Sequence, residues 1–229
     1  KVPDVSWGEM ESIFKKWLLL SDKGVLRILF GVYLAHILGG DPVWLFLVAP
    51  PGGAKTELLR AFYMARGVYP ISELTARTFA SGLDTPNGDP SLLARLSDEV
   101  LILKDFTTVL EMSRDERQAI LAQLREIYDG RFDKAWGTGK ELHWRGRLGF
   151  MAGVTPVIDR HQAVLSVLGE RFLQTRIQQP NRLESAKAAM LSVGYEAEMR
   201  DELAQAVAGC LAGLGTPMPA QVAPDATLR

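Results

Sequence analysis

The sequence predicts an α/β protein with a central, mostly parallel five-stranded sheet, flanking helices and a small helical appendage at its C-terminal end. Short apolar runs of strand length alternate with longer segments of helical periodicity, which is typical of parallel α/β folds. The clearest strand, Val43–Ala49, is almost entirely apolar and is followed by the turn residues Pro50-Pro51-Gly52-Gly53. With 47% hydrophobic and 23% charged residues, the 229-residue chain has enough apolar material for a substantial core.

Four more elements are predicted around this strand. Apolar residues recur at helical spacing over Ser6–Leu20, and a second helix is expected from the cap-like Ser21-Asp22 to Leu38, where Gly39-Gly40 ends it. After the strand, we expect a helix over Thr56–Ala65 and a weaker strand at Val68–Ile71.

The same alternation continues to the end of the chain. The predicted elements are a loop at Ser81–Pro90, a strand at Val100–Leu103, a helix at Ser113–Tyr128, a β-hairpin at Arg131–Arg147, strands at Leu148–Val154 and Phe172–Gln178, and two helices over Asn181–Leu214 that are broken near Gly194. These segments divide the chain into an N-terminal helical segment (1–40), an α/β core (41–180), a helical lid (181–214) and a linker or tail (215–229).

Composition excludes several classes of protein. The formal net charge of −1 gives no sign of a basic nucleic-acid-binding coat, although a locally basic element is compatible with it. A single cysteine, Cys210, excludes a disulfide framework and a cysteine-based zinc site. The apolar runs are shorter than the roughly eighteen residues of a membrane span. We therefore expect a cytoplasmic protein with no membrane association, and, because the chain starts at Lys1 without a leader, a processed or excised piece.

The strongest functional signal is the segment APPGGAKT at residues 49–56. It matches the phosphate-loop pattern G-x-x-x-x-G-K-[ST], with alanine at both glycine positions. A strand-to-helix turn of this kind directs backbone N–H groups at phosphate oxygens, and here Lys55 would reach the β- and γ-phosphates while the Thr56 hydroxyl would ligate Mg²⁺. The nucleotide-binding candidates are Pro51, Gly52, Gly53, Ala54, Lys55, Thr56 and Glu57.

Two points about this segment stay open. An ordinary Gly/Pro turn before a helix would have a similar composition. At Ala54, a positive φ would cost an alanine about 1 kcal/mol or more, whereas a negative φ would make the replacement of glycine mild.

Phosphoryl transfer also needs a carboxylate near the metal, at the end of a neighbouring strand. Asp105, two residues after the strand Val100–Leu103, has that placement, although a turn or helix cap would read the same way. Phe106 follows it, where many such ATPases have a glutamate that positions the attacking water. Glu73 is the best-placed substitute and Glu111 a weaker one; alternatively, hydrolysis is slow or absent.

The chain resembles the AAA+ ATPases. APPGGAKT stands where they have GPPGSGKT, and VLILKD stands where they have the Walker B strand. The segment after Asp105 is similar to members with a β-hairpin before sensor 1, which include minichromosome maintenance helicases and some phage and mobile-element helicases. This similarity covers residues 41–180 and rests on SRDERQAILAQLREIYDG, GRFDKAWGTGKELHWRGR, LGFMAGVTP and VLGERFLQTRI.

The resemblance implies a P-loop fold, ATP and Mg²⁺ as cofactors, and a homo-oligomeric ring, typically a hexamer, that hydrolyses ATP at subunit interfaces. Asp105 would hold the metal through water, and Thr155 would stand at the sensor 1 position, where a polar side chain orients the attacking water. Apart from the resemblance, Thr155 would be read as a strand-end cap before Pro156.

The same resemblance implies roles for four arginines. Arg171 would match the arginine finger that reaches into the neighbouring subunit, with Arg160 and Arg176 as rivals, and Arg200 is a candidate sensor 2 arginine on the lid. Without the resemblance, Arg171 would be read as part of a surface salt bridge.

The predicted hairpin at residues 131–147 is locally basic. Five cationic and two acidic side chains give it a net charge of +3, and two tryptophans interleave with them. Cations for phosphates and aromatic rings for base stacking are what a single-strand nucleic-acid contact uses. Lys134, Trp136 and Lys140 are the best candidates, and an exposed hairpin with solvated charges is the alternative.

Together these features favour the motor domain of a ring-forming DNA helicase or translocase of a phage or mobile element. Two alternatives remain: a nucleotide-gated assembly module with little hydrolysis, and an AAA+ ATPase that remodels a protein partner. Folds of this class serve many substrates, so the site has to decide between them.

Overall fold

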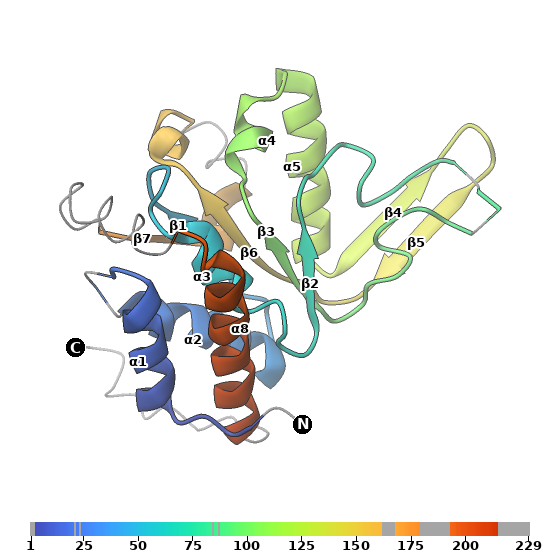
Figure 1. The fold of residues 1–229 in the computed structure, drawn as a ribbon. Helices are drawn as coiled ribbons and strands as arrows, with labels where there is room; N and C mark the ends of the chain where they lie inside the picture. Colours follow the sequence, from blue (N-terminus) through green and yellow to red (C-terminus); the bar gives the residue numbers. More distant parts are fainter. Residues whose placement is uncertain are drawn as a thin grey trace, which may run out of the picture.

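The computed structural model of the protein describes residues 3–20, 22, 24–83, 85–86, 88–161, 168–178 and 193–214. Helices cover both faces of one central sheet, and a two-stranded hairpin projects to one side (Figure 1). The predicted α/β class and the five-stranded central sheet are confirmed.

All neighbouring strands of the central sheet run parallel, in the order β2-β3-β6-β1-β7. The strands are β1 (Trp44–Val48), β2 (Val68–Ile71), β3 (Val100–Leu103), β6 (Gly149–Val154) and β7 (Phe172–Arg176). Every residue of β1, β3 and β6 is buried, because helices cover both faces of these inner strands, whereas β2 and β7 at the edges are partly exposed.

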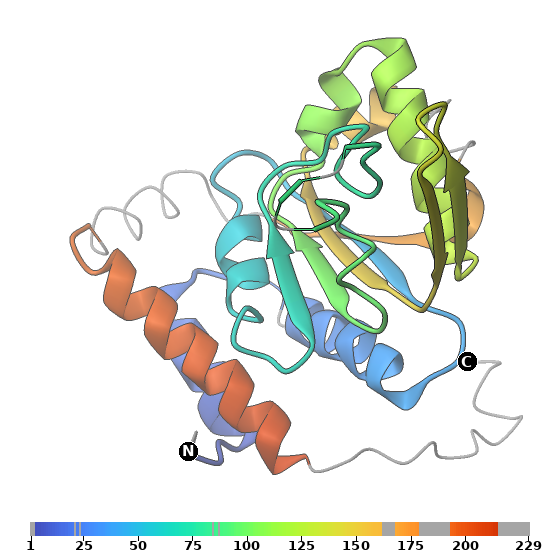
Figure 2. The same cartoon turned by 90° about the vertical axis from the view of Figure 1, so that its right-hand side faces the viewer.

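One face of the sheet is covered by four helices: α1 (Trp7–Trp17), α2 (Gly24–Leu38), α3 (Lys55–Arg60) and α8 (Glu196–Gly213). A capping box starts α1, in which Ser6 and Glu9 exchange hydrogen bonds. Helix α8 lies alongside α1, although the two are far apart in the sequence (Figure 2). Leu45, Leu47 and Ile102 of the sheet face this layer.

The opposite face is covered by α4 (Thr107–Glu111), α5 (Arg114–Tyr128), residues 74–96 and the base of the hairpin β4 (Arg131–Ala135) and β5 (Glu141–Arg145). Aromatic rings dominate this half of the core. Phe46 of β1 stacks on Phe172 of β7 at 3.9 Å between ring centroids, and Trp44 donates its indole N–H to the Leu148 carbonyl. The hairpin lies beside the sheet, and its buried side chains belong to this aromatic half of the core.

Several boundaries differ from the prediction. Helix α3 ends at Arg60 instead of Ala65. The following residues, 61–66, form turns with hydrogen bonds between residues three apart, and in this conformation the Phe62 side chain is buried. Strand β7 ends at Arg176, and the short elements α4, η1 (Pro156–Arg160) and η2 (Gly169–Arg171) were not predicted.

At the C-terminal end, Gly194 has φ +87° in a turn just before α8, at the predicted break between two helices. The first of those helices and the tail 215–229 lie outside the described residues. Among the helices that the structure describes, none is long and apolar enough to cross a membrane.

Candidate functional site

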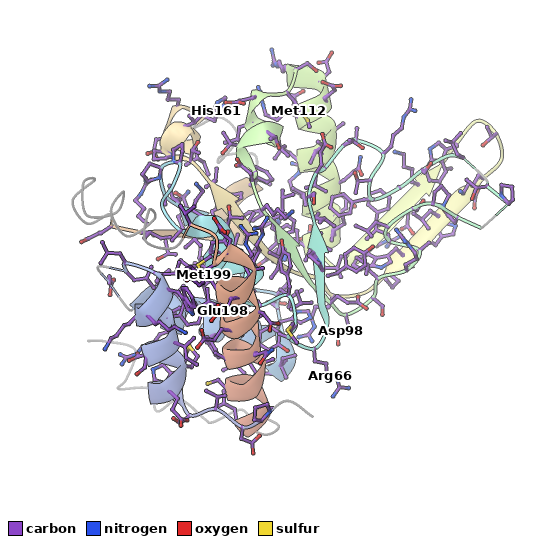
Figure 3. All side chains as sticks on the ribbon, in the orientation of Figure 1. Arg66, Asp98, Met112, His161, Glu198 and Met199 are labelled. Carbon is purple, nitrogen blue, oxygen red and sulfur yellow. The ribbon has the colours of Figure 1, made fainter. Side chains whose placement is uncertain are left out.

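Three adjacent strands end at the same edge of the sheet, which we call the carboxyl edge. The loop that contains Lys55 follows β1, Thr155 follows β6, and Asp105 follows β3. In parallel α/β sheets, ligands bind outside the carboxyl ends of the strands, where successive connections run to opposite sides. Figure 3 shows Met112 and His161, which follow α4 and η1, beyond this edge, and Asp98 at the opposite, amino edge. The fold thus brings the predicted loop, carboxylate and sensor position together.

The loop between β1 and α3 has an unusual backbone. Gly52 has φ +76°, and Ala54 has φ +58° and ψ 0°, which makes it the one non-glycine residue with positive φ in the described part of the chain. The Gly53 amide donates to the Pro50 carbonyl at 3.0 Å and closes the turn. The loop therefore takes the conformation that strains an alanine, at a cost of about 1 kcal/mol or more.

Lys55 is a buried cation at the start of α3. It is 8% exposed, and its Nζ donates to the Pro50 carbonyl at 3.2 Å. Burial lowers the pKa of Lys55, and the nearby carboxylate of Asp105 partly opposes that shift. No ion pair of Lys55 occurs among the described residues, so the ammonium rests against a carbonyl of its own loop.

The next residues of α3 connect the loop to the C-terminal helix. Thr56 and Glu57 are half-buried. Glu57 accepts two hydrogen bonds from Arg200 of α8, at 3.0 and 3.1 Å, and one from Arg60 at 3.1 Å. The hydrogen bond to Glu57 raises the pKa of Arg200. Arg200, the sensor 2 candidate, therefore lies beside the loop of its own chain.

Asp105 and Thr155 are joined by a residue that the sequence reasoning missed. The Thr107 amide donates to Asp105 Oδ1 at 2.8 Å. The Thr107 hydroxyl accepts from the Thr155 amide at 3.0 Å and donates to the Thr155 hydroxyl at 3.2 Å. A threonine two residues after a strand-end aspartate is the signal that could have pointed to it, because Asp side chains often accept from the amide two residues on.

Phe106 occupies the position where a catalytic glutamate was considered. Its side chain is fully buried and packs against Phe46, with 4.8 Å between ring centroids, in the aromatic half of the core. A side chain at this position points away from the carboxyl edge.

The structure does not bring the alternative carboxylates close to Lys55. Glu73 is exposed beyond the end of β2, and β3 and β6 separate β2 from β1, which corresponds to about 14 Å at the usual strand spacing. Glu111 is exposed at the end of α4. Among the residues that the structure describes, no group of three or more His, Cys, Asp or Glu side chains could hold a metal ion by itself.

Arg171 lies at the amino edge of the sheet. It directly precedes Phe172, which pairs with Trp44 at the start of β1. Its guanidinium donates to both carboxylate oxygens of Asp129, at 3.1 and 3.2 Å, and lies 5.3 Å from the Tyr128 ring centroid. Arg171 and Lys55 of the same chain therefore lie at opposite edges of the sheet, the amino edge and the carboxyl edge.

The rival arginines lie elsewhere. Arg176, at the end of β7, pairs with Val48 in the sheet and is therefore at the carboxyl edge, where it forms a bidentate ion pair with Asp159 at 2.6 and 3.0 Å. This hydrogen-bonded partner raises the pKa of Arg176. Arg160 is exposed at the end of η1.

The hairpin packs against the loop 81–90. Half-buried Trp136 lies so close to Gly82 that a Cβ there would come within 2.6 Å of the indole. The Lys140 side chain is 11% exposed, donates to the Leu83 carbonyl at 2.7 Å and lies 3.1 Å from Asp89. Lys134 is half-buried beside Trp136, 5.4 Å from its ring centroid. All three nucleic-acid candidates thus make contacts within the chain.

A groove of about 500 Å³ lies between β2 and the segment that follows it. Its lining includes Glu73, the hydroxyl groups of several threonines and serines, and the exposed arginines Arg77 and Arg95. Neither arginine takes part in an ion pair within the described ranges.

The outer face of the hairpin carries a self-contained charge cluster. Asp133 accepts hydrogen bonds from Arg131, Arg145 and His143. The hydrogen bonds from Arg145, His143 and Arg131 lower the pKa of Asp133, and those to Asp133 and Glu141 raise the pKa of His143.

Comparison of the chain with models of protein families and with curated proteins finds no match. The function therefore has to be inferred from the residues and their geometry.

Proposed function

We propose that the protein binds ATP with Mg²⁺ at the carboxyl edge and hydrolyses it as the motor domain of a ring-forming DNA helicase or translocase. The observation that carries the proposal is Lys55: a buried ammonium behind a strained glycine-containing loop, which forms no ion pair within the part of the chain that the structure describes. A buried charge without a paired counter-charge is costly, and a phosphate in the loop would supply that counter-charge.

The neighbouring residues fit a metal that arrives with the nucleotide. Mg²⁺ takes hard oxygen ligands, keeps several waters, and in phosphate sites binds one or two carboxylates together with phosphate oxygens. Thr56 offers a hydroxyl after β1 and Asp105 a carboxylate after β3, on either side of the end of β6 at the carboxyl edge. Such an ion would neutralise charge that develops on the transferring phosphate. Lys55 would bind the β- and γ-phosphates, and Thr155 would hold the attacking water or a γ-phosphate oxygen.

The position of Arg171 supports a site shared between two copies of the chain. An arginine at the amino edge cannot reach the carboxyl edge of its own sheet, so it could act only on a neighbour's nucleotide. An arginine supplied in this way is worth about 10³–10⁵ in rate in other NTPases. Arg176, in contrast, is already at the carboxyl edge of its own chain.

Cations on and beside the hairpin support a nucleic-acid substrate. Lys134 lies beside Trp136, and Arg77 and Arg95 line the adjoining groove, so phosphate-binding and stacking groups occur on one side of the molecule. Lys140 would contribute mainly by holding the hairpin against residues 81–90.

A nucleotide-gated assembly module is the second candidate, and Phe106 favours it. Phe106 has its side chain in the core, and Glu73 and Glu111 are exposed, so no glutamate stands beside Asp105 at the position where many such ATPases have one. In this case ATP would drive assembly with negligible hydrolysis.

Phosphate release from ATP across a protein dilution series, with and without single-stranded DNA, tests the proposal. Wild type should show turnover per chain that rises with protein concentration and with DNA, and both Lys55→Ala and Arg171→Ala should abolish it. Arg176→Ala is the matched control and should retain most of the turnover, because Arg176 lies at the carboxyl edge of its own sheet and not at the amino edge that would face a neighbour's nucleotide.

The alternative outcomes are distinct. Turnover per chain that is constant on dilution and unaffected by Arg171→Ala would overturn the ring motor. Tight ATP binding that Lys55→Ala abolishes, without any phosphate release, would establish the assembly module instead.

A further inference from the structure

Thr107 connects the ends of β3 and β6 at the carboxyl edge. It is 7% exposed and makes three hydrogen bonds, one to Asp105 and two to Thr155. Its backbone amide bonds to the Asp105 carboxylate, and its side-chain hydroxyl bonds to Thr155. No other residue in the described part of the chain bonds to both.

The surroundings hold Thr107 in place. Phe106, one residue earlier, is anchored in the core, and its amide donates to the Gly153 carbonyl at 2.6 Å. Gly153 permits this approach of the two strand ends, since a Cβ there would lie 2.5 Å from the Lys104 carbonyl oxygen. The segments 104–107 and 153–155 therefore form one rigid unit.

The direction of the hydrogen bonds matters for Thr155. A hydroxyl group donates one proton and accepts at two lone pairs. Because the Thr155 oxygen accepts the Thr107 proton, its own proton is left to be donated to a group outside this pair. A donor that points outward suits a phosphate oxygen.

We propose that Thr107 is a positioning residue that orients the Thr155 hydroxyl toward the terminal phosphate and fixes its position relative to Asp105. This inference rests on the proposed nucleotide site and adds a residue to it. The Thr107 amide is bonded to Asp105 and its hydroxyl donates to Thr155, so it acts through Thr155. The group that Thr155 would read is the γ-phosphate, which ATP has and ADP lacks.

The test uses two substitutions of Thr107 that keep its size or its chemistry. Thr107→Val keeps the shape of the side chain and the hydrogen bond from the backbone amide to Asp105, but it removes the hydroxyl. Thr107→Ser keeps the hydroxyl. We would measure the dissociation constants of the non-hydrolysable analogue AMP-PNP and of ADP, both with Mg²⁺, and the phosphate-release rate. Thermal unfolding would show that each variant is folded.

Thr107→Val should reduce the preference for AMP-PNP over ADP about tenfold, because the Thr155 hydroxyl is no longer oriented and its hydrogen bond to the charged γ-phosphate oxygen is lost. It should leave the affinity for ADP within about twofold of wild type. Where wild type turns over, kcat should fall at least tenfold with little change in KM. Thr107→Ser should restore wild-type values, and Thr107→Val combined with Thr155→Val should be no worse than Thr155→Val alone.

A preference for AMP-PNP that is unchanged in Thr107→Val, or effects of the two valine substitutions that simply add, would overturn the inference while leaving the nucleotide site intact. Equal loss of AMP-PNP and ADP binding in Thr107→Val would assign the residue a purely structural role. Failure of wild type to bind either nucleotide would overturn the proposed function, and this inference with it.

Discussion

The hairpin and the carboxyl edge of the sheet both carry charged groups, but they use them differently. On the hairpin, Asp133 is surrounded by Arg131, Arg145 and His143, and Lys140 is held by Asp89 and a carbonyl. At the carboxyl edge, Lys55 has a carbonyl partner and no ion pair within the residues that the structure describes. The hairpin's charges bind one another, whereas Lys55 at the carboxyl edge donates to a backbone carbonyl.

This difference separates charges that stabilise the protein from charges that are available to a ligand. Surface ion pairs contribute little to stability, so the hairpin cluster mainly sets local conformation. A buried cation such as Lys55, whose hydrogen-bond partner is a carbonyl, is kept at a cost, which is typical of a functional site. The following predictions test the two regions against each other.

The largest effect is expected at Phe106. Phe106→Glu places an unpaired carboxylate in the aromatic core instead of at the carboxyl edge, and we expect it to lower the free energy of unfolding by at least about 3 kcal/mol. Phe106→Leu should cost less than about 1.5 kcal/mol. Urea denaturation measures both. A Phe106→Glu protein of wild-type stability with increased ATPase activity would show that this side chain does face the nucleotide site.

Ala54→Gly should stabilise the protein by about 0.5 to 1 kcal/mol, since it relieves the strain of positive φ and loses part of the gain to the entropy of the unfolded chain. Gly52→Ala is the matched control in the same loop. Its φ is +76° and a Cβ would meet open space, so it should destabilise through the backbone alone. Equal midpoints for wild type and Ala54→Gly in thermal unfolding would contradict a strained loop.

Lys134→Ala and Lys140→Ala should separate nucleic-acid binding from hairpin packing. Lys134→Ala should weaken binding of a labelled single-stranded oligonucleotide roughly threefold at 50 mM salt, as expected for the loss of one phosphate contact. Lys140→Ala should chiefly lower thermal stability, because it releases the contacts with Asp89 and Leu83. Fluorescence anisotropy and melting curves measure the two effects, and the reverse assignment would refute this division.

The smallest effect concerns His143. Its pKa should lie above the ordinary 6.5, because Asp133 and Glu141 accept hydrogen bonds from its ring. A group whose pKa is raised in the folded state adds stability below its unfolded pKa and loses it as the pH rises through the folded value. NMR titration of the histidine should therefore give a pKa that Asp133→Asn lowers, and a value unchanged by that substitution would show that the cluster does not form in solution.

The sequence was sufficient to predict the class of fold and most strands. Strands β1, β3 and β6 are continuous apolar runs between turn residues. Such a run indicates a strand whose side chains are buried on both faces of the sheet. The sheet order was not predictable in this way, because pairing of β1 with β6 and β7 depends on contacts between distant segments. The early end of α3 has a similar origin, since burial of Phe62 outweighs local helical preference.

The candidate site was predictable in its residue types but not in its detailed contacts. The pattern around Lys55 and the strand-end position of Asp105 followed from local sequence. The contact of Trp136 with Gly82, the pairing of Arg171 with Asp129 and the bonds of Thr107 to Thr155 join residues far apart in the chain. Phe106 was read as a substitution within the site, whereas at the start of α4 its side chain packs against Phe46 in the core.

The ion pair between Arg200 and Glu57 gives the C-terminal helix a mechanical connection to the site. Helix α8 packs along α1, and at Arg200 it is held by two bonds to the residue next to Thr56. The Arg200 guanidinium therefore joins α8 to the first turn of α3, in addition to the packing of α8 against α1. If the proposed function holds, a shift of α8 would move Glu57 and, with it, the residues that follow the loop between β1 and α3.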